Sequence, residues 1–340
     1  MAVKPRILFR ADASCALGFG HVARLCALIE EAEAQGFETI AMFAGEERAI
    51  RAWAADRKLV VDLREWSATQ VMQVAEHPRT VAMIVDGPEI ARTVIPKLPE
   101  RIRAIAIDDV GKCPLTLAAV VNHNVHAPGI AASYPAAKVR LLGRRYLMLR
   151  RDIRRYLRGS CRPTRGARLR VIISFGGSDP VGATARTLSV LPPDRPLELV
   201  VIAGPGFRDE AALQIGIATA VAAGHTVDLR RSPEDPGALF VSADAAICSA
   251  GGTLGELAYL GCPALAYAIV RDQVAAARHQ VIDGLIAGGR NWAEVDDASL
   301  REEMLGFVLD DAGRHAIRGL ALATVDSDGP RRIIEEAMAA

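Results

Sequence analysis

The sequence predicts an α/β protein made of two doubly wound domains, each built around a mainly parallel sheet. Apolar runs rich in β-branched residues alternate with helix-like segments, the pattern of a parallel sheet covered on both faces. This series stops at a loop-like stretch, 160–166, and then begins again. With 340 residues, 51% of them hydrophobic, the chain can fill two cores. We expect an N-terminal domain over 1–158, a C-terminal domain over 166–325 and a final helix over 326–340.

Strands of the first half are predicted from apolar runs of strand length that are bounded by turn residues. These runs are 7–10, 39–43, 59–61, 81–85, 102–107 and 139–142. A helix is expected after the first of them, because Val22, Leu25, Leu28 and Ile29 recur at helical spacing. Gly36 gives that helix a C-terminal stop.

The second half repeats this pattern, with glycine or proline turns between the runs. Its predicted strands are 169–174, 197–202, 226–229, 245–248 and 264–267, and the main turns are 176–180, 204–206 and 261–263. In open α/β sheets a ligand binds outside the carboxyl ends of the strands. We therefore expect a ligand held in a cleft that the two domains face.

Composition narrows the function classes. The formal net charge is +1, which argues against a nucleic-acid-binding protein, and no apolar run approaches the roughly 20 residues of a membrane span. We expect a cytoplasmic protein with reduced cysteines, since its six cysteines include no Cys-x-x-Cys pair. Arginines are dense over 144–170, which indicates a solvated connection or, alternatively, a peripheral membrane or anion contact.

A glycine-hinged turn near the N-terminus, Gly18-Phe19-Gly20-His21, precedes the first predicted helix. Free backbone N–H groups at a helix N-terminus favour an anion and disfavour an imidazolium. We expect His21 to be neutral there and able to accept a proton. The segment resembles a dinucleotide-binding motif, but about eight residues separate it from the strand, so no NAD or FAD is expected.

Two further glycine turns, in the second half, are candidate phosphate sites, because each follows a predicted strand and opens a helix. They contain Gly176, Gly177 and Ser178 in the first turn, and Gly251, Gly252 and Thr253 in the second. Glu256 lies one helical turn beyond the second turn, where a carboxylate can accept a hydrogen bond from a ribose hydroxyl.

Acidic and amide residues follow several predicted strands and are candidate substrate contacts. They are Asp12, Asp86, the pair Asp108-Asp109, and Asp272-Gln273. A metal site is not expected, since no third ligand stands at a recognisable spacing from the aspartate pair.

Six motifs in this order resemble the PseG family, the nucleotide-sugar hydrolases of pseudaminic acid biosynthesis. They are Arg10-Ala11-Asp12-Ala13-Ser14, Gly18-x-Gly20-His21-Val22-x-Arg24, Ile107-Asp108-Asp109, Leu142-Gly143-x-x-Tyr146-x-x-Leu149-Arg150, Ser174-Phe175-Gly176-Gly177-Ser178-Asp179-Pro180 and Ala250-Gly251-Gly252-Thr253-x-x-Glu256.

The resemblance implies a GT-B architecture related to MurG. It also implies an enzyme that releases UDP from UDP-2,4-diacetamido-2,4,6-trideoxy-β-L-altropyranose without a cofactor or metal. It implies that UDP is held by the two glycine turns of the second half and by Glu256. His21 would activate water, and Asp12 is its candidate catalytic partner. The candidate substrate contacts are Gly18, Gly20, Arg24, Asp86, Asp109, Asp272 and Gln273.

Two alternatives remain open at this point, and in each case we expect a monomer. One is a GT-B glycosyltransferase, in which a sugar or lipid acceptor replaces water. The other is a non-catalytic nucleotide-sugar binding protein. It is motivated by Pro88, where the family usually has tyrosine, and by Asp272, where it usually has asparagine.

Overall fold

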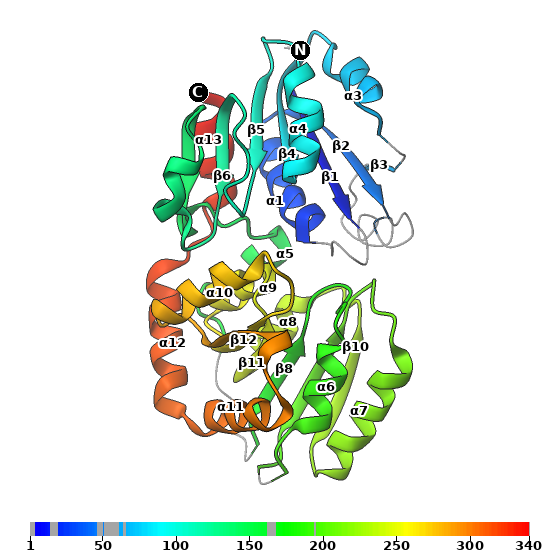
Figure 1. Ribbon diagram of the computed structural model, residues 1–340, viewed down its shortest axis with the longest axis vertical. Coiled ribbons are helices and arrows are strands. Elements are labelled where there is room, and N and C mark those ends of the chain that lie inside the picture. The colour runs from blue at the N-terminus through cyan, green and yellow to red at the C-terminus, as the bar shows by residue number, and fades with distance from the viewer. Residues whose placement is uncertain are drawn as a thin grey trace. The chain divides into compact units, whose positions relative to one another are not determined.

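A computed structural model shows two compact units (Figure 1). It describes residues 4–13, 20–45, 50, 61–63, 66–161, 168–193 and 195–339. Unit 1 comprises Met1–Arg151 together with Ser327–Ala340, and unit 2 comprises Asp152–Asp326. The division after Arg151 lies several residues before the boundary loop that we expect from the sequence, at 160–166.

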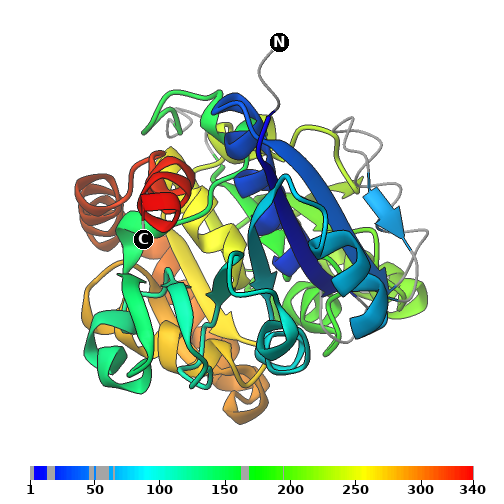
Figure 2. The same ribbon diagram turned by 90° about the horizontal axis from the view of Figure 1, so that it is seen from above.

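Unit 1 contains, in the described part of the chain, a seven-stranded parallel sheet of order β3-β2-β1-β4-β5-β6-β7. Its strands are β1 (Arg6–Ala13), β2 (Glu38–Gly45), β3 (Val61–Leu63), β4 (Thr80–Asp86), β5 (Arg103–Ile107), β6 (Leu117–Asn122) and β7 (Ala137–Leu142). Figure 2 shows β1 and β2 side by side, with β3 at the edge. Strand order reverses between β1 and β4, and open α/β sheets bind ligands at the carboxyl ends of the strands at such a switch point.

Helices cover both faces of this sheet. Ile7 and Phe9 of β1 pack toward α1 (Gly20–Ala34) and α13 (Gly329–Ala339), whereas Leu8 packs on the other face with residues of α3 (Ala68–Ala75) and α4 (Pro88–Val94). This alternation follows from the period of two in a strand. The shorter helical segments are η1 (Ile95–Lys97), η2 (Ala127–Ser133), η3 (Arg144–Tyr146) and α5 (Arg151–Arg154).

Unit 2 contains a six-stranded parallel sheet of order β10-β9-β8-β11-β12-β13 within the described residues. Its strands are β8 (Arg170–Ser174), β9 (Glu198–Ala203), β10 (Thr226–Arg231), β11 (Ala245–Ser249), β12 (Ala264–Ala268) and β13 (Ala287–Asn291). Its helices are α6 (Ala183–Val190), α7 (Glu210–Ala222), α8 (Pro236–Val241), α9 (Gly252–Leu260), α10 (Gln273–Ile282), η4 (Trp292–Glu294), α11 (Asp297–Leu309) and α12 (Asp311–Thr324). Here the order reverses between β8 and β11.

The predicted fold class, two doubly wound α/β domains, is confirmed, but two strands were not predicted. β6 is rich in alanine, a weak strand former. β13 contains Gly288 and Gly289 at φ +79° and +75°, and a Cβ added at Gly289 would lie 2.3 Å from Val281 Cγ2. Its strand conformation depends on pairing with β12, a partner that the local sequence does not reveal.

The predicted first helix is confirmed as α1, whose buried side includes Val22, Leu25, Leu28 and Ile29. Gly36 follows it at φ +90°, a conformation suited to glycine. The final helix, α13, belongs to unit 1, where Ile333 joins the core beside α1.

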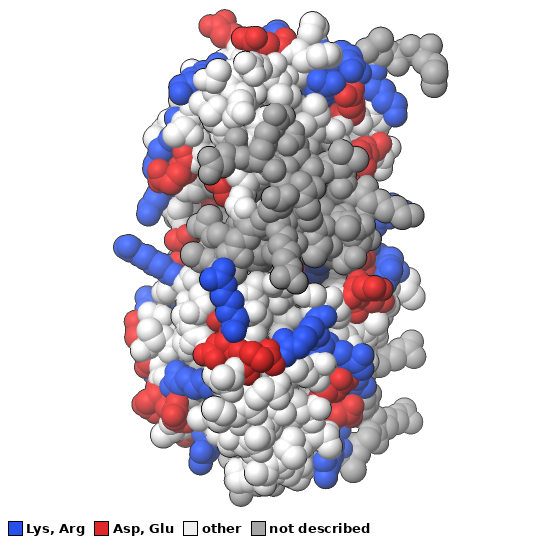
Figure 3. All heavy atoms as spheres, turned by 90° about the vertical axis from the view of Figure 1, so that its right-hand side faces the viewer, with Lys and Arg blue, Asp and Glu red and all other residues white. Residues whose placement is uncertain are grey.

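Surface charge is mixed. On the face drawn in Figure 3, basic and acidic side chains are interspersed among uncharged ones. In the described part of the chain no helix is both long and apolar enough to cross a bilayer. The five described cysteines are free and buried, and Cys15 lies outside the described residues.

Candidate functional site

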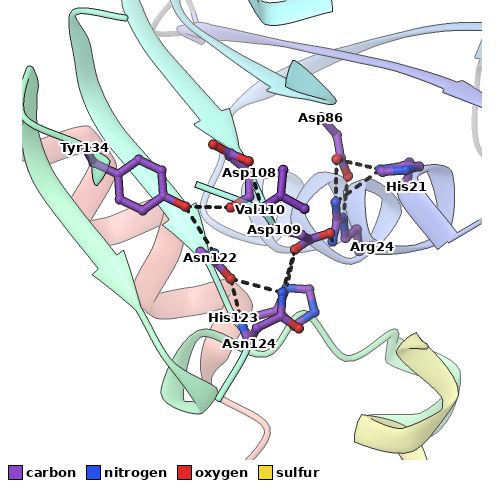
Figure 4. A network of polar contacts seen from close by, with 10 residues as sticks. All are labelled: His21, Arg24, Asp86, Asp108, Asp109, Val110, Asn122, His123, Asn124 and Tyr134. Carbon is purple, nitrogen blue, oxygen red and sulfur yellow. Dashed lines mark hydrogen bonds and ion pairs between the residues drawn. The ribbon is translucent and has the colours of Figure 1, made fainter. Parts of the chain in front are cut away.

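Four neighbouring strands of unit 1 each deliver one titratable group to the same edge of the sheet (Figure 4). His21 is the second residue of α1, which follows β1, and Asp86 ends β4. Asp109 follows β5, and His123 follows β6. Because the carboxyl ends of parallel strands share one edge, the switch point between β1 and β4 gathers them.

Asp86 is the centre of this cluster. Its carboxylate is almost completely buried, with His21 Nδ1 2.7 Å from Oδ1 and Arg24 Nε 2.5 Å from Oδ2. Since an ionised carboxylate can only accept, His21 Nδ1 must carry the hydrogen of that bond. In the neutral ring, Nε2 is then left with a lone pair, the arrangement that a general base needs.

Arg24 joins the two carboxylates of the cluster. Its Nη2 lies 2.6 Å from Asp86 Oδ1, and its Nη1 lies 2.6 Å from Asp109 Oδ2. The Arg24 side chain is only 13% exposed, so these contacts compensate a guanidinium charge that is largely removed from water. Arg24 is a candidate substrate contact by sequence, but each of its three guanidinium nitrogens faces a carboxylate. Its geometry is that of a group that positions Asp86.

The charges of the cluster set the protonation states. Asp86 raises the pKa of His21 above its ordinary value, against the opposing effect of burial. Burial acts to raise the pKa of Asp86, yet Arg24 and His21 together hold it well below its usual range. The expectation of a neutral His21 at the helix N-terminus therefore omits the stronger influence, since a carboxylate at hydrogen-bond distance outweighs the partial charge of a helix end.

This arrangement predicts a titration that can be measured directly. We expect the pKa of the His21 ring to lie above the ordinary histidine value, and Asp86→Asn to lower it because the amide carries no charge. NMR of the ring Cε1–H signals would follow both, with Glu89→Gln, an exposed carboxylate on α4, as the control. An unchanged His21 pKa in Asp86→Asn would contradict the pairing. Because the folded pKa is raised, the stabilisation from His21 is complete below its unfolded pKa and lost as pH rises through the folded one.

The two adjacent aspartates have different roles. Asp108 accepts hydrogen bonds from the backbone nitrogens of Val110, Lys112 and Cys113 at 3.0, 2.6 and 2.7 Å, and so shapes the loop after β5. Asp109 instead faces Arg24 and Asn124. Among the described residues no group of three or more His, Cys, Asp or Glu side chains is arranged to hold a metal ion.

Asp12 lies apart from this cluster in its hydrogen bonding. Ala11 belongs to the core on the α1 side of the sheet, and Asp12 is the next residue of β1. Successive strand residues face opposite sides of the sheet, so Asp12 faces away from Ala11. Asp12 pairs with Arg10, two residues earlier in the strand.

Of the two glycines predicted to contact substrate, Gly20 is the first residue of α1 and is exposed, while Gly18 lies outside the described residues.

The switch point of unit 2 brings together the two predicted glycine turns. A Cβ added at Gly176 would lie 3.8 Å from Ser249 Oγ, and one added at Gly251 would lie 3.7 Å from the same atom. Gly251 is also close to Gln273, whose Nε2 would be 3.2 Å from that Cβ. The Gln273 side chain is held by Ile269, whose backbone N–H donates to its Oε1 at 3.0 Å.

The helices after these turns differ in their capacity to bind an anion. Asp179, at φ +43°, accepts hydrogen bonds from Ala183 N at 2.8 Å and Thr184 N at 2.7 Å, so a carboxylate of the chain already caps α6. By contrast α9 begins at Gly252 without a side-chain cap. Backbone donors and the helix dipole favour an anion at an uncapped N-terminus, so the second turn is the stronger candidate.

The remaining candidates of unit 2 lie around these turns. Ser178 is buried in the first turn, and Thr253 is half-buried in the first turn of α9. Glu256 is buried on α9, at 9% exposure. Asp272 is exposed at the N-cap of α10 and makes no side-chain capping bond.

A close backbone contact supports the first turn and gives a stability prediction. A Cβ added at Gly204 would lie 2.5 Å from Gly177 Cα, and Gly206 N donates to Gly177 O at 2.8 Å. Gly204→Ala is expected to lower stability by about 1–3 kcal/mol, because backbone atoms must move to admit the methyl group. Thermal unfolding would measure this, with Gly319→Ala, which has open space, as the control. Equal Tm values for the two variants would contradict the contact.

His123, Asn122, Asn124 and Tyr134 complete the unit 1 network but are not predicted site residues. Tyr134 donates to the Asp108 carbonyl oxygen at 2.8 Å and accepts from Asn122 Nδ2 at 3.1 Å. Asn124 Nδ2 lies 3.1 Å from Asp109 Oδ1. The missed signal is the apolar run before Asn122: once 117–121 is recognised as a strand, the polar residues that follow fall at the same sheet edge as Asp86.

No protein-family model and no curated protein sequence matches this chain. Solved structures do match over nearly the whole chain. MurG of Acinetobacter baumannii has a TM-score of 0.67 at 15% identity, covering 99% of this chain and 100% of that one. MnaA of S. aureus, solved with UDP, has a TM-score of 0.67 at 9% identity and covers 97% and 95%.

A third similar structure is a putative UDP-N-acetylglucosamine 2-epimerase from Listeria monocytogenes. Its TM-score is 0.65 at 12% identity, with 98% of this chain and 96% of that one covered. Identities this low establish architecture alone. The expectation of a MurG-related architecture is confirmed: the chain has the GT-B fold, with two Rossmann-like domains.

Proposed function

We propose that this protein is a UDP-sugar hydrolase that releases UDP and a free diacetamido-trideoxy sugar for the synthesis of a pseudaminic-type nonulosonic acid. The observation that carries the proposal is the pair of His21 and Asp86 at the switch point of unit 1, where Nδ1 is bound to a buried carboxylate at 2.7 Å. A histidine held in this way can take a proton from water through Nε2.

The nucleotide is assigned to unit 2. The uncapped N-terminus of α9 offers backbone donors from Gly252 and Thr253 for the diphosphate, and Gln273 lies beside the same turn. Ser249 lies beside both glycine turns: the turn of Gly176, Gly177 and Ser178, and the turn that precedes α9. Glu256 on α9 is the candidate acceptor for ribose.

The proposed reaction needs one proton acceptor and one anion site. Neutral His21 accepts a proton from water as the water oxygen attacks the anomeric carbon. The bond from that carbon to the diphosphate oxygen breaks, and UDP departs with the electron pair. Asp86 stabilises the imidazolium that forms, and the backbone N–H groups of α9 stabilise the charge on the departing diphosphate. Since UDP leaves as a stable anion, no metal or cofactor is required.

Two independent lines support this proposal. The motifs that resemble the PseG family include His21 and both glycine turns. Among proteins of the same fold, S. aureus MnaA was solved with UDP, and UGT89C1 of Arabidopsis thaliana was solved with UDP-L-rhamnose, at a TM-score of 0.63 and 10% identity for the latter.

UDP release in the absence of any acceptor tests the proposal. The substrates would be a panel of UDP-linked 2,4-diacetamido-2,4,6-trideoxy-hexoses, with UDP detected by a coupled assay and the sugar by NMR. The expected result is stoichiometric UDP and free sugar. Binding of every UDP-sugar without release would overturn the hydrolase and favour a non-catalytic binding protein.

A glycosyltransferase is the second candidate, because solved structures similar to this chain include MurG and the calicheamicin glycosyltransferase CalG4. In that case a sugar or lipid hydroxyl would replace water at His21. The same assay separates the two, since a transferase would release UDP quickly only after an acceptor is added.

A further inference from the structure

His123 forms a second histidine–aspartate pair in unit 1. Its Nδ1 lies 4.0 Å from Asp109 Oδ1, and its side chain is only 15% exposed (Figure 4). Nδ1 itself is buried and has no hydrogen-bond partner among the described residues. A buried polar atom without a hydrogen-bond partner is unfavourable, and the carboxylate of Asp109 is the charged group nearest to it.

The surroundings of the ring determine which nitrogen carries the hydrogen. Asp109 receives hydrogen bonds from Arg24 at 2.6 Å and Asn124 at 3.1 Å. Burial acts to raise the pKa of Asp109, but Arg24 and His123 hold it below its ordinary value, so the carboxylate is ionised. A ring lone pair directed at this anion would be repelled. Nδ1 of His123 therefore carries the hydrogen, and the lone pair is on Nε2.

The pKa values of the two histidines of the cluster are shifted in opposite directions. Burial lowers the pKa of His123, and Arg24 and His21 act in the same direction, against Asp109 and Asp86. Asp86 instead raises the pKa of His21. When their environments push the pKa values of two titratable groups apart, the two groups can take different acid–base roles. The lowered pKa of His123 favours its neutral ring, which is a hydrogen-bond acceptor through Nε2.

This part of unit 1 suits a ligand rich in hydrogen-bond donors. The guanidinium nitrogens of Arg24 face Asp86 and Asp109, so the cation of the cluster is already paired. A diphosphate would meet two carboxylates here, which is unfavourable. Hydroxyl and amide N–H groups would instead find an acceptor in His123.

We propose that Nε2 of His123 accepts a hydrogen bond from a hydroxyl or amide N–H group of the sugar, and so contributes to sugar selection. This inference rests on the proposed function, because it assigns one part of a UDP-sugar to unit 1. It does not require hydrolysis, since the hydrogen bond would form in the bound complex before any bond breaks.

Calorimetric affinities for UDP and for UDP-2,4-diacetamido-2,4,6-trideoxy-β-L-altropyranose test the proposal. The enzymes would be the wild type, His123→Ala, His123→Gln and the control His77→Ala, whose residue lies before β4, at the opposite edge of the sheet. His123→Ala is expected to weaken the UDP-sugar about tenfold and UDP very little. His123→Gln keeps an acceptor near the position of Nε2 and is expected to recover part of the loss.

Equal weakening of both ligands would indicate a structural role and would overturn the proposal, as would no weakening at all. Equal affinity of the wild type for UDP and the UDP-sugar would also overturn it. Sugar-selective weakening without any hydrolysis by the wild type would support His123 while the proposed function fails. The ring ¹⁵N shifts of His123 give an independent check, because a hydrogen on Nε2 at pH 7 would contradict the assigned acceptor.

Discussion

His21→Ala is expected to slow UDP release by about 10²–10⁴-fold, the usual contribution of a general base. The variant loses the atom that takes the proton from water, and it leaves the buried Asp86 without the partner that lies 2.7 Å away. UDP affinity is expected to change little, since the glycine turns of unit 2 are untouched. Initial rates of UDP release and calorimetric UDP binding would measure the two effects separately.

The matched control is His315→Ala. His315 is exposed on α12, where its Nδ1 lies 2.8 Å from the Asp311 carbonyl oxygen, outside the candidate site. Its replacement is expected to leave the rate unchanged. A His21→Ala enzyme with a rate near that of the wild type would remove His21 from the chemistry. A loss of UDP binding equal to the loss of rate would point instead to a disturbed fold.

Arg24→Met is expected to destabilise unit 1 by about 3–5 kcal/mol, because it leaves Asp86 and Asp109 buried without their shared cation. For a protein of this size that corresponds to a fall in Tm of several degrees or more. Methionine keeps much of the side-chain volume, so the loss reports charge rather than a cavity. Thermal and urea unfolding would measure it.

The pH dependence of the Arg24→Met defect separates charge from packing. In the wild type, Asp86 and Asp109 have lowered pKa values, so their contribution is present above the unfolded pKa and lost as pH falls through the folded values. In the variant, burial would raise both pKa values, and acidification would reduce the defect. Arg231→Met breaks an exposed pair with Glu210 and is expected to cost at most about 1 kcal/mol. An equally small, pH-independent loss in Arg24→Met would contradict the paired cluster.

Residues whose role depends on local geometry could be predicted from the sequence. The helix expected at His21 is present and begins at Gly20, and the turns at Gly176 and Gly251 do follow strands at a switch point. Asp86 was placed correctly at a strand end. These positions follow from strand periodicity and turn chemistry, which a single segment contains.

Features that depend on contacts between distant segments could not be predicted. Arg24 and Asp86 meet only because β1 and β4 are adjacent, although many residues separate them in sequence. The pKa direction of His21 was misjudged for the same reason. Asp12 stands at the end of a predicted strand, but the face of the sheet on which its side chain lies depends on the strand register, since a shift of one residue reverses that face. The cap on α6 arises from Asp179 in a left-handed conformation that its motif does not disclose.

The return of the chain to unit 1 has a consequence for synthesis on the ribosome. Ile333 and Ile334 of α13 are buried in the core formed with α1, yet they are translated only after the whole of unit 2. Unit 2, which ends at Asp326, has its entire sequence available before them. Although domains generally fold in order from the N-terminus, here unit 1 contains the earlier β1 yet has its whole sequence available only after unit 2. A nascent chain stalled before α13 would expose the α1 side of the first sheet.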